Sequence, residues 1–305
     1  MMSNFPSVYP GARVALVCPS SAVPEERLDA ALAAVRELGL EPVAYPSCYY
    51  VNRHGYFAAD DAQRAKDIQE AFADPSIQGI ICIRGGYGAH RLMDLLDLRE
   101  IARHPKLFCG YSDVTALHIA LNQRCRMVTY HTPMPSTEWY KGLDEFTMTY
   151  LRRALFGALT GAMPMGAGVE TIQSGTTRGV LCGGNLSLVC DSLGTPWEID
   201  TRGKILFLED VGEKTYRIDG MLTQLRNAGK FSDCAGILLG YWTDCEPEYP
   251  EKTLLIPEIV GEVVVPSGKP ILAGLACGHS LPTMSLPLGA VAVMDADAKT
   301  LEVLG

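Results

Sequence analysis

The chain has 305 residues, of which 48% are hydrophobic and 20% are charged, and its formal net charge is −9. This composition is typical of a soluble globular protein, and the length is sufficient for two domains. The acidic balance, together with the lack of a Lys/Arg stripe with interleaved aromatic residues, argues against a nucleic-acid partner.

Targeting, membrane and metal signals are missing from the sequence. The first ten residues contain no basic segment followed by an apolar run, so we expect no signal peptide. No apolar stretch approaches the roughly 18 residues needed to span a bilayer. The ten cysteines form no C-x-x-C pair and no metal-ligand spacing, and most lie in apolar segments. We therefore expect a cytoplasmic protein with reduced cysteines, no membrane segment and no metal site.

Short apolar strands alternate with amphipathic helices in the first half of the chain. Strands are predicted at Val14–Cys18, Gly79–Ile83, Leu107–Cys109 and Met127–Tyr130, and helices at residues 24–39, 60–73 and 113–124. Such alternation predicts a parallel sheet that is covered on both faces, with functional loops at the carboxyl ends of its strands. The loop that begins at Gly85 and the turn that holds Ser112 both fall at such ends.

The pattern changes between Pro133 and about Gly175, where Pro, Gly and Met become frequent. We interpret residues 136–176 as a linker between an N-terminal domain, 1–135, and a C-terminal domain, 177–305. In the second domain, strands are predicted at residues 178–182, 204–208, 236–241 and 271–276, and helices at 185–193, 218–229 and 256–265. Residues 291–294 and 300–303 predict a hairpin.

The segment Lys106–His118 predicts a strand, a tight turn that carries Ser112, and a helix. A serine on such a turn lies beside the free N–H groups that open the helix, and these groups can stabilise an oxyanion. The alternative is that Ser112 caps the helix and that Asp113 is an acidic first-turn residue. A nucleophile elbow has the pattern G-x-S-x-G, and Val114 stands where the last glycine is expected. The turn by itself therefore favours capping.

A serine nucleophile needs a histidine base and a carboxylate that orients this base. Among the six histidines, His118 lies on the helix after the serine but on a different face, whereas His131 and His279 each follow an apolar strand. Glu209 and Asp210 end another apolar strand, where alternation sends them to opposite faces. Spacing alone leaves the choice of histidine and the choice of acid open.

A glycine-rich run, Gly85-Gly86-Tyr87-Gly88, follows the strand that ends at Ile83. It resembles a phosphate-binding nest, but the dinucleotide fingerprint needs a glycine where Arg91 stands, and no G-K-[ST] follows. The same run of backbone N–H groups can instead supply a second donor to an oxyanion.

Five motifs occur in one order over nearly the whole chain. They are Arg84-Gly85-Gly86-Tyr87-Gly88, Gly110-Tyr111-Ser112-Asp113, Gly183-Gly184-Asn185, Leu208-Glu209-Asp210-Val211 and Gly278-His279. Together they resemble the LD-carboxypeptidase family of serine peptidases, which includes murein tetrapeptide carboxypeptidases and microcin-C-immunity peptidases. The resemblance implies an α/β fold, with a flavodoxin-like parallel sheet in the N-terminal domain and a mixed sheet in the C-terminal α/β domain. It also implies a site between the domains, a homodimer and no cofactor.

The resemblance assigns roles residue by residue. It implies that Ser112 is the nucleophile, Glu209 the orienting acid and His279 the base, and that the backbone N–H groups of Gly86 and Asp113 form the oxyanion hole. The candidate substrate-binding residues are Arg84, Tyr87, Asn185 and Arg217. A structural ion pair explains either arginine equally well.

The activity implied by the resemblance is release of D-alanine from the C-terminus of a murein tetrapeptide, as part of cell-wall recycling. An amidase that inactivates a microcin-like peptidyl-nucleotide antibiotic is an alternative with the same triad. The immunity-type members tend to be longer, which favours the tetrapeptide. An alternative of another class is a non-catalytic two-domain protein that binds an anion or a peptide at its glycine-rich loop.

Overall fold

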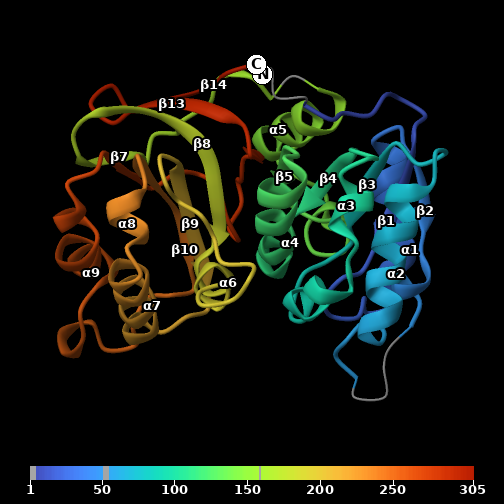
Figure 1. The fold of residues 1–305 in the computed structure, drawn as a ribbon, viewed down its shortest axis with the longest axis horizontal. Helices are drawn as coiled ribbons and strands as arrows, with labels where there is room; N and C mark the ends of the chain where they lie inside the picture. The colour runs from blue at the N-terminus through green and yellow to red at the C-terminus, as the bar shows by residue number, and fades with distance from the viewer. Residues whose placement is uncertain (1–4, 51–54, 158) are drawn as a thin grey trace. The chain divides into compact units, whose positions relative to one another are not determined.

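The computed structural model describes residues 5–50, 55–157 and 159–305 (Figure 1). The chain forms two compact units, of which the first comprises Met1–Leu159 and Met284–Gly289 and the second comprises Thr160–Thr283 and Ala290–Gly305. Residues 136–176, which we interpreted as a linker, contain helix α5 (Glu145–Phe156) and strands β6 (Gly161–Ala162) and β7 (Glu170–Gln173). The two units divide this segment between them.

The sheet of the first unit has the strand order β12-β5-β4-β3-β1-β2. Its strands are β1 (Arg13–Val17), β2 (Glu41–Ala44), β3 (Gly79–Cys82), β4 (Leu107–Gly110), β5 (Thr129–His131) and β12 (Leu286–Leu288). Strands β1 to β5 are parallel and follow the flavodoxin order 2-1-3-4-5, and β12 pairs antiparallel with β5. The flavodoxin-like parallel sheet predicted for the N-terminal domain is confirmed.

The helices of this unit are α1 (Glu25–Glu37), α2 (Asp61–Ala73), α3 (Leu98–Ile101), α4 (Thr115–Ala120) and α5, with 3₁₀ turns at Pro46–Cys48, Ala89–Leu95, Ser112–Val114 and Trp139–Lys141. Helices α1 to α4 of this unit connect its parallel strands, and α5 follows the last of these strands. The helix predicted at residues 113–124 is divided, because a 3₁₀ turn precedes α4 and a π turn, Leu121–Cys125, follows it. All residues of β3 and β4 are buried, as expected for strands covered on both faces.

The sheet of the second unit is mixed and has the strand order β6-β14-β13-β8-β9-β10-β11-β7. Besides β6 and β7, its strands are β8 (Thr176–Asn185), β9 (Ile205–Val211), β10 (Gly236–Thr243), β11 (Ile271–Ala273), β13 (Val291–Asp295) and β14 (Thr300–Val303). Strands β8 to β11 are parallel, and the other four join the sheet antiparallel. The predicted mixed sheet and the β13–β14 hairpin are confirmed.

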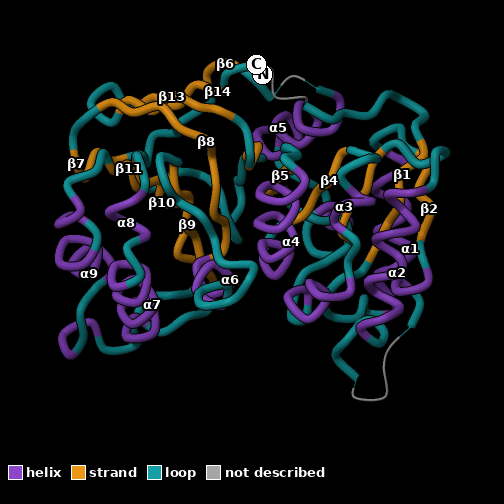
Figure 2. Tube along the Cα trace, viewed as in Figure 1, coloured by secondary structure: helices purple, strands orange, loops and turns teal. Residues whose placement is uncertain are grey.

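Helices of the second unit pack beside the parallel strands. They are α6 (Leu186–Asp191), α7 (Thr215–Asn227), α8 (Lys230–Asp233) and α9 (Ile256–Val263), with 3₁₀ turns at Pro250–Lys252 and Val265–Ser267. Helix α6 packs on β8 and β9, and α7 packs on α6, α8 and α9. Figure 2 shows α7, α8 and α9 together on one side of the strands. The carboxyl ends of β8 and β9 therefore meet at one edge of this sheet, where Asn185 and Glu209 lie.

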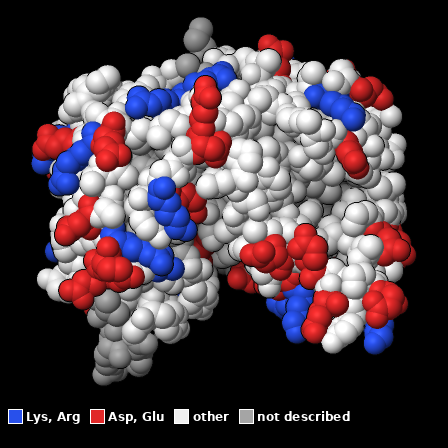
Figure 3. All heavy atoms as spheres, turned by 180° about the vertical axis from the view of Figure 1, so that it is seen from behind, with Lys and Arg blue, Asp and Glu red and all other residues white. Residues whose placement is uncertain are grey.

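Charged residues of both signs are mixed on the surface. On the face shown in Figure 3, described Lys and Arg side chains lie among Asp and Glu rather than in one continuous basic patch. Among the described residues, no helix combines the length and apolar character that a membrane span requires.

Candidate active site

Ser112 lies between β4 and α4, at the first position of the 3₁₀ turn. Its φ angle is 64°, a left-handed value that is strained for any residue with a side chain. Tyr111 occupies the N-cap position, and among the described residues no side chain caps this turn. Ser112 is therefore not the helix cap that the turn by itself suggested. A serine on a strained strand-to-helix turn is instead the geometry of a nucleophile elbow.

Gly110 explains why valine is tolerated at position 114. A Cβ atom on Gly110 would lie 3.0 Å from Cγ1 of Val114 and 3.0 Å from Cβ of Cys82. Val114 is fully buried and packs against the bare Cα of Gly110. The departure from G-x-S-x-G thus fills space that the glycine before the serine leaves open.

The glycine-rich loop after β3 lies against the Ser112 turn. A Cβ atom on Gly85 would lie 3.1 Å from Cβ and 3.3 Å from Oγ of Ser112. Gly86 has a φ of 119°, and a Cβ atom there would lie 2.2 Å from Oγ of Ser21. Because both glycines lack side chains, the loop can approach the serine closely, as an oxyanion donor at Gly86 requires.

Asp113, the other candidate donor, has a side chain that is buried beneath the turn and is 1% exposed. Its Oδ2 accepts hydrogen bonds from the hydroxyl of Ser20 at 2.5 Å and from the N–H of Ala89 at 2.7 Å. The sequence analysis missed Ser20 and Ser21, which follow β1. The signal that marks them is their position at the carboxyl end of β1, beside the point where the strand order reverses.

His279 and Glu209 form a close pair in the second unit. Nδ1 of His279 lies 2.7 Å from Oε2 of Glu209, whose side chain is fully buried at the end of β9. Burial raises the pKa of the Glu209 carboxyl, and the adjacent His279 opposes this rise. Gly278 permits the contact, because a Cβ atom there would lie 2.9 Å from Oε2. A carboxylate that holds one imidazole nitrogen fixes the tautomer and orientation of the ring, as a histidine base requires.

Asp210 has a different task from its neighbour Glu209. Its Oδ1 accepts a hydrogen bond from Nδ2 of Asn185 at 2.8 Å, and its Oδ2 accepts from the N–H and hydroxyl of Ser187 at 3.0 and 2.6 Å. Asn185 in turn caps α6 by accepting from the N–H of Leu188. A hydrogen bond from Asn185 also opposes the rise in the pKa of Glu209. Asn185 thus contacts both acids, while Asp210 holds the start of α6.

The two other histidines considered above belong to the first unit and are buried there. His118 contacts Oγ1 of Thr129 at 2.8 Å and the carbonyl oxygen of Gly110 at 2.9 Å. Burial lowers the pKa of His118 to about 4, so its ring is neutral near pH 7. His131, on β5, is 2% exposed and packs edge-on against the ring of Tyr111.

The two candidate arginines have protein partners. Arg84 donates from Nη1 to the carbonyl oxygen of Ala22 at 2.7 Å and from Nε to that of Gly85 at 3.2 Å, and so it ties two loops together. Arg217, on α7, is exposed and lies 3.8 Å from a carboxylate oxygen of Glu213. Arg217 therefore fits the structural ion pair that the sequence analysis left open, whereas the hydrogen bonds of Arg84 go to backbone carbonyl oxygens.

Tyr87 is 44% exposed and lies one residue beyond Gly86. Its ring belongs to an aromatic group with Tyr56, Phe57 and His90, at centroid distances between 5.1 and 6.1 Å. An exposed ring beside the glycine-rich loop is able to contact a ligand there.

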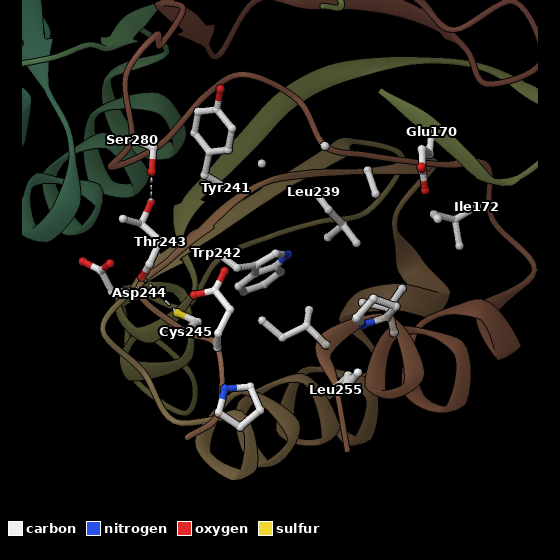
Figure 4. Close-up of a pocket in the computed structure, with 18 residues that line it drawn as sticks. Glu170, Ile172, Leu239, Tyr241, Trp242, Thr243, Asp244, Cys245, Leu255 and Ser280 are labelled. Atoms are coloured by element: carbon white, nitrogen blue, oxygen red, sulfur yellow. Dashed lines mark hydrogen bonds between the residues drawn. The ribbon is translucent and has the colours of Figure 1, made fainter. Parts of the chain in front are cut away.

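A cavity of about 660 Å³ opens in the second unit between β10 and α9 (Figure 4). The register of the parallel ladder pairs Trp242 with Asp210, so the indole lies on the Asp210 face of the sheet and not on the Glu209 face. Figure 4 shows this indole in the middle of the cavity, between Leu239 and Leu255. The lining of the cavity also includes Gly240, which lies close to Glu209, and Ser280, which follows His279 in the chain. Among the described residues, no group of His, Cys, Asp and Glu has the arrangement to hold a metal ion.

Two family models match the chain in sequence order. The model of the LD-carboxypeptidase N-terminal domain matches residues 14–132, and that of the LD-carboxypeptidase C-terminal domain matches residues 178–294. A probable murein peptide carboxypeptidase of Bacillus subtilis (strain 168) is 39% identical over 296 residues, which are 95% of this chain and 91% of that protein.

Solved structures share the fold. The muramoyltetrapeptide carboxypeptidase from Oxalobacter formigenes is similar with a TM-score of 0.84 and 28% identity, over 96% of this chain and 98% of that chain. MccF in complex with glutamyl sulfamoyl guanosine is similar with a TM-score of 0.89 and 21% identity, over 99% of both chains. At that identity, the likeness to MccF concerns the fold alone.

Proposed function

Because the chain belongs to the LD-carboxypeptidase family of peptidases, we propose that it is a serine carboxypeptidase that releases D-alanine from murein tetrapeptides. The observation that carries the proposal is the 2.7 Å contact between His279 and the buried Glu209. The strained conformation of Ser112 supports it. The names of the relatives from Bacillus subtilis and Oxalobacter formigenes support a murein peptide as the substrate class.

In the proposed mechanism, Oγ of Ser112 attacks the carbonyl carbon of the bond before the terminal D-amino acid, and Nε2 of His279 takes the hydroxyl proton. The step requires the imidazole to lie within hydrogen-bond reach of the hydroxyl. The backbone N–H groups of Gly86 and Asp113 stabilise the tetrahedral oxyanion, and one such donor is typically worth about 3 kcal/mol.

The acyl-enzyme then forms and is hydrolysed. His279 gives its proton to the leaving amine of D-alanine, and the same imidazole later activates the water that attacks the acyl-enzyme. Glu209 stays ionised, accepts the hydrogen bond from Nδ1 and stabilises the imidazolium. The mechanism requires no cofactor.

Recognition of the free terminal carboxylate needs a cation or a cluster of N–H donors. We propose Arg84, Tyr87 and Asn185 as the first positions to substitute, since each lies beside a member of the proposed triad or oxyanion hole. Arg217 remains a candidate with less support, because it is exposed and paired with Glu213. We also propose a cytoplasmic homodimer that acts in peptidoglycan recycling, and light scattering of the purified protein tests the dimer.

The decisive experiment is incubation with L-Ala-γ-D-Glu-meso-diaminopimelate-D-Ala. We expect wild type to release D-alanine and Ser112→Ala to release none. If wild type releases none while a fluorophosphonate still labels Ser112, the substrate is wrong and the nucleophile is right. If Ser112 is not labelled either, the serine-peptidase mechanism is wrong.

The amidase alternative is tested in parallel. Cleavage of a processed microcin-like aminoacyl-adenylate, without release of D-alanine from the tetrapeptide, would favour that alternative.

A further inference from the structure

We propose that Ser20, Ser21 and the carboxylate of Asp113 form a brace that sets the positions of the two oxyanion-hole N–H groups. The inference rests on the proposed function, in which Gly86 and Asp113 supply these N–H groups. The members of this serine brace are positioning residues, because they act through the backbone of the two donors and not on the reacting atoms.

The first half of the brace joins the loop after β1 to the nucleophile turn. Ser20 is fully buried and donates from its hydroxyl to Oδ2 of Asp113 at 2.5 Å. The same oxygen accepts the N–H of Ala89 at 2.7 Å, which fastens the far end of the glycine-rich loop to the turn. Hydrogen bonds to a buried carboxylate are stronger than neutral ones and costly to break.

The second half holds the near end of the glycine-rich loop. The N–H of Ser21 donates to the carbonyl oxygen of Gly85 at 3.3 Å, and Oγ of Ser21 accepts the N–H of Tyr87 at 3.1 Å. These two hydrogen bonds flank Gly86 on either side. Oγ of Ser21 also occupies the space that a side chain on Gly86 would need. The peptide that carries the Gly86 N–H is therefore fixed from both directions.

The brace joins the segments that follow three neighbouring strands, β1, β3 and β4. One proposed donor follows β3 and the other follows β4, while the two serines follow β1 on the other side of β3. Oxyanion donors act only within about 2.7–3.1 Å of the developing charge, so a small shift of one loop against the other weakens a hydrogen bond in the transition state. A loop that is hydrogen-bonded to both donor segments fixes their separation before the substrate arrives.

Asp113 offers a conservative and a disruptive variant at one position. Both hydrogen bonds fall on Oδ2, whereas Oδ1 is buried and has no hydrogen-bond partner among the described residues. An asparagine can place its carbonyl oxygen at the Oδ2 position and keep both bonds, but an alanine keeps neither. Asp113→Asn should therefore rescue what Asp113→Ala loses.

The kinetic test measures kcat and KM for D-alanine release, and the rate at which a fluorophosphonate labels Ser112. We expect Ser20→Ala and Asp113→Ala to lower kcat and the labelling rate together by about 10- to 100-fold, with KM changed by less than about twofold. Asp113→Asn should keep most of the activity, and Ser21→Ala should show a smaller loss than Ser20→Ala. The acid limb of the pH profile should not move, because the hydrogen bonds of the brace join segments of the first unit and involve no group that titrates as the proposed base.

Ser192→Ala is the matched control. Ser192 is a buried serine of the second unit that donates to the carbonyl oxygen of Val189 at 2.7 Å and accepts from the N–H of Ile199 at 3.1 Å. Its loss removes two buried hydrogen bonds without touching the brace. We expect a lower melting temperature for this variant and an unchanged kcat.

Hydrogen exchange of the peptide containing residues 85–89 tests the brace without any substrate. We expect faster exchange in Ser20→Ala and Asp113→Ala than in wild type, Asp113→Asn and Ser192→Ala. Unchanged exchange, or faster exchange with unchanged kcat and labelling, overturns the brace. If Asp113→Ala does not fold, Ser20→Ala decides the result. A wild type that neither releases D-alanine nor is labelled overturns the proposed function instead, and exchange still reports whether the loop is held.

Discussion

Ser112 adopts a backbone conformation that most residues other than glycine avoid. The glycines around Ser112 leave the space that this conformation needs. Gly85 and Gly110 leave space at distances where a Cβ atom would press on Ser112, Val114 or Cys82. Strain of this kind persists only where the surrounding packing enforces it, and it is concentrated at functional sites. The close packing around Gly85 and Gly110 therefore helps to hold Ser112 in this conformation.

Removal of this strain should be measurable. Glycine adopts a φ near 64° without steric cost, whereas alanine keeps the strain, which is worth about 1–3 kcal/mol. In urea unfolding, we expect the free energy of unfolding of Ser112→Gly to exceed that of Ser112→Ala by up to about 2 kcal/mol. This difference already allows for the larger conformational entropy of glycine in the unfolded chain. Both variants should be inactive. A glycine variant less stable than the alanine variant would contradict the strained turn.

The difference in stability between a Glu209→Gln variant and wild type should depend on pH. Burial raises the pKa of Glu209 above the usual 4.5, so ionisation of this carboxyl destabilises the folded state. A group with a raised folded pKa stabilises the protein below its unfolded pKa, and this contribution is lost as pH rises through the folded pKa. Glu209→Gln removes the titration. The stability of the variant relative to wild type should therefore be greatest above the folded pKa, should diminish as the pH falls from there towards 4.5, and should stay constant below 4.5.

Denaturant unfolding at several pH values measures this difference. A relative stability of Glu209→Gln that grows on acidification would contradict the raised pKa. D-alanine release should fall in the same variant, because a neutral amide does not stabilise the imidazolium as a carboxylate does.

The candidate site was only partly predictable at the level of residues. Alternation placed Glu209 and Asp210 on opposite faces but did not say which face holds the histidine. The φ angle of Ser112 depends on how Val114 packs against Gly110, which no local pattern reveals. Ser20 and Ser21 lie in a short polar loop, and their importance follows from hydrogen bonds to segments far along the chain.

Among the elements, the interior strands were predicted and the edge strands were missed. The apolar runs at β1, β3 and β4 are strong signals because both faces of these strands are covered. The sequences of β2 and β12 include Pro42 and Pro287, and proline weakens a strand signal because it lacks the N–H that a central strand donates. Helix α5 was missed because it lies between segments rich in Pro and Gly, although Asp144 caps it.

Gly240, on β10, lies where this strand packs closely against Glu209 and against the loop that carries His279. A Cβ atom there would lie 2.4 Å from the carbonyl oxygen of Cys277 and 3.2 Å from Cβ of Glu209. Gly240→Ala should displace the loop that carries His279 and lower D-alanine release by at least about tenfold, because small misplacements of a catalytic group are costly.

Gly220→Ala provides the control. Gly220 lies on α7, and no described atom would lie within 4 Å of its added Cβ. Alanine is a better helix former than glycine, so this variant should keep its activity and be slightly more stable. Equal activity in the two alanine variants would show that the β10 contact does not position His279.

The whole molecule differs from two consecutive domains. Residues 284–289 return to the first unit, where β12 pairs with β5 in the register Leu286–His131 to Leu288–Thr129. The boundaries predicted at 1–135 and 177–305 came from shifts in composition. Such shifts cannot reveal a strand whose partner is so distant in sequence, because that pairing is specified by the tertiary fold.

The pairing of β12 with β5 can be tested by a complementation experiment. Leu286 and Leu288 are fully buried, and burial of each leucine side chain is worth about 1.5–3 kcal/mol. A fragment of residues 1–159 leaves the β5 edge uncovered, so it should be unstable and prone to aggregate. A synthetic peptide of residues 283–290 should raise its melting temperature. A peptide with Leu286→Asp and Leu288→Asp should not, and equal effects of the two peptides would contradict the prediction.

The path of β12 also determines the order in which the protein is completed on the ribosome. N-terminal segments generally fold first during synthesis. Here, however, the sheet that holds the serine turn gains its last strand only after residues 286–288 have been translated, when the second unit is almost entirely made. The turn that holds Ser112 therefore belongs to an unfinished sheet until residues 286–288 have been translated. A chain that is released before residue 286 therefore carries Ser112 on a sheet whose β5 edge is uncovered.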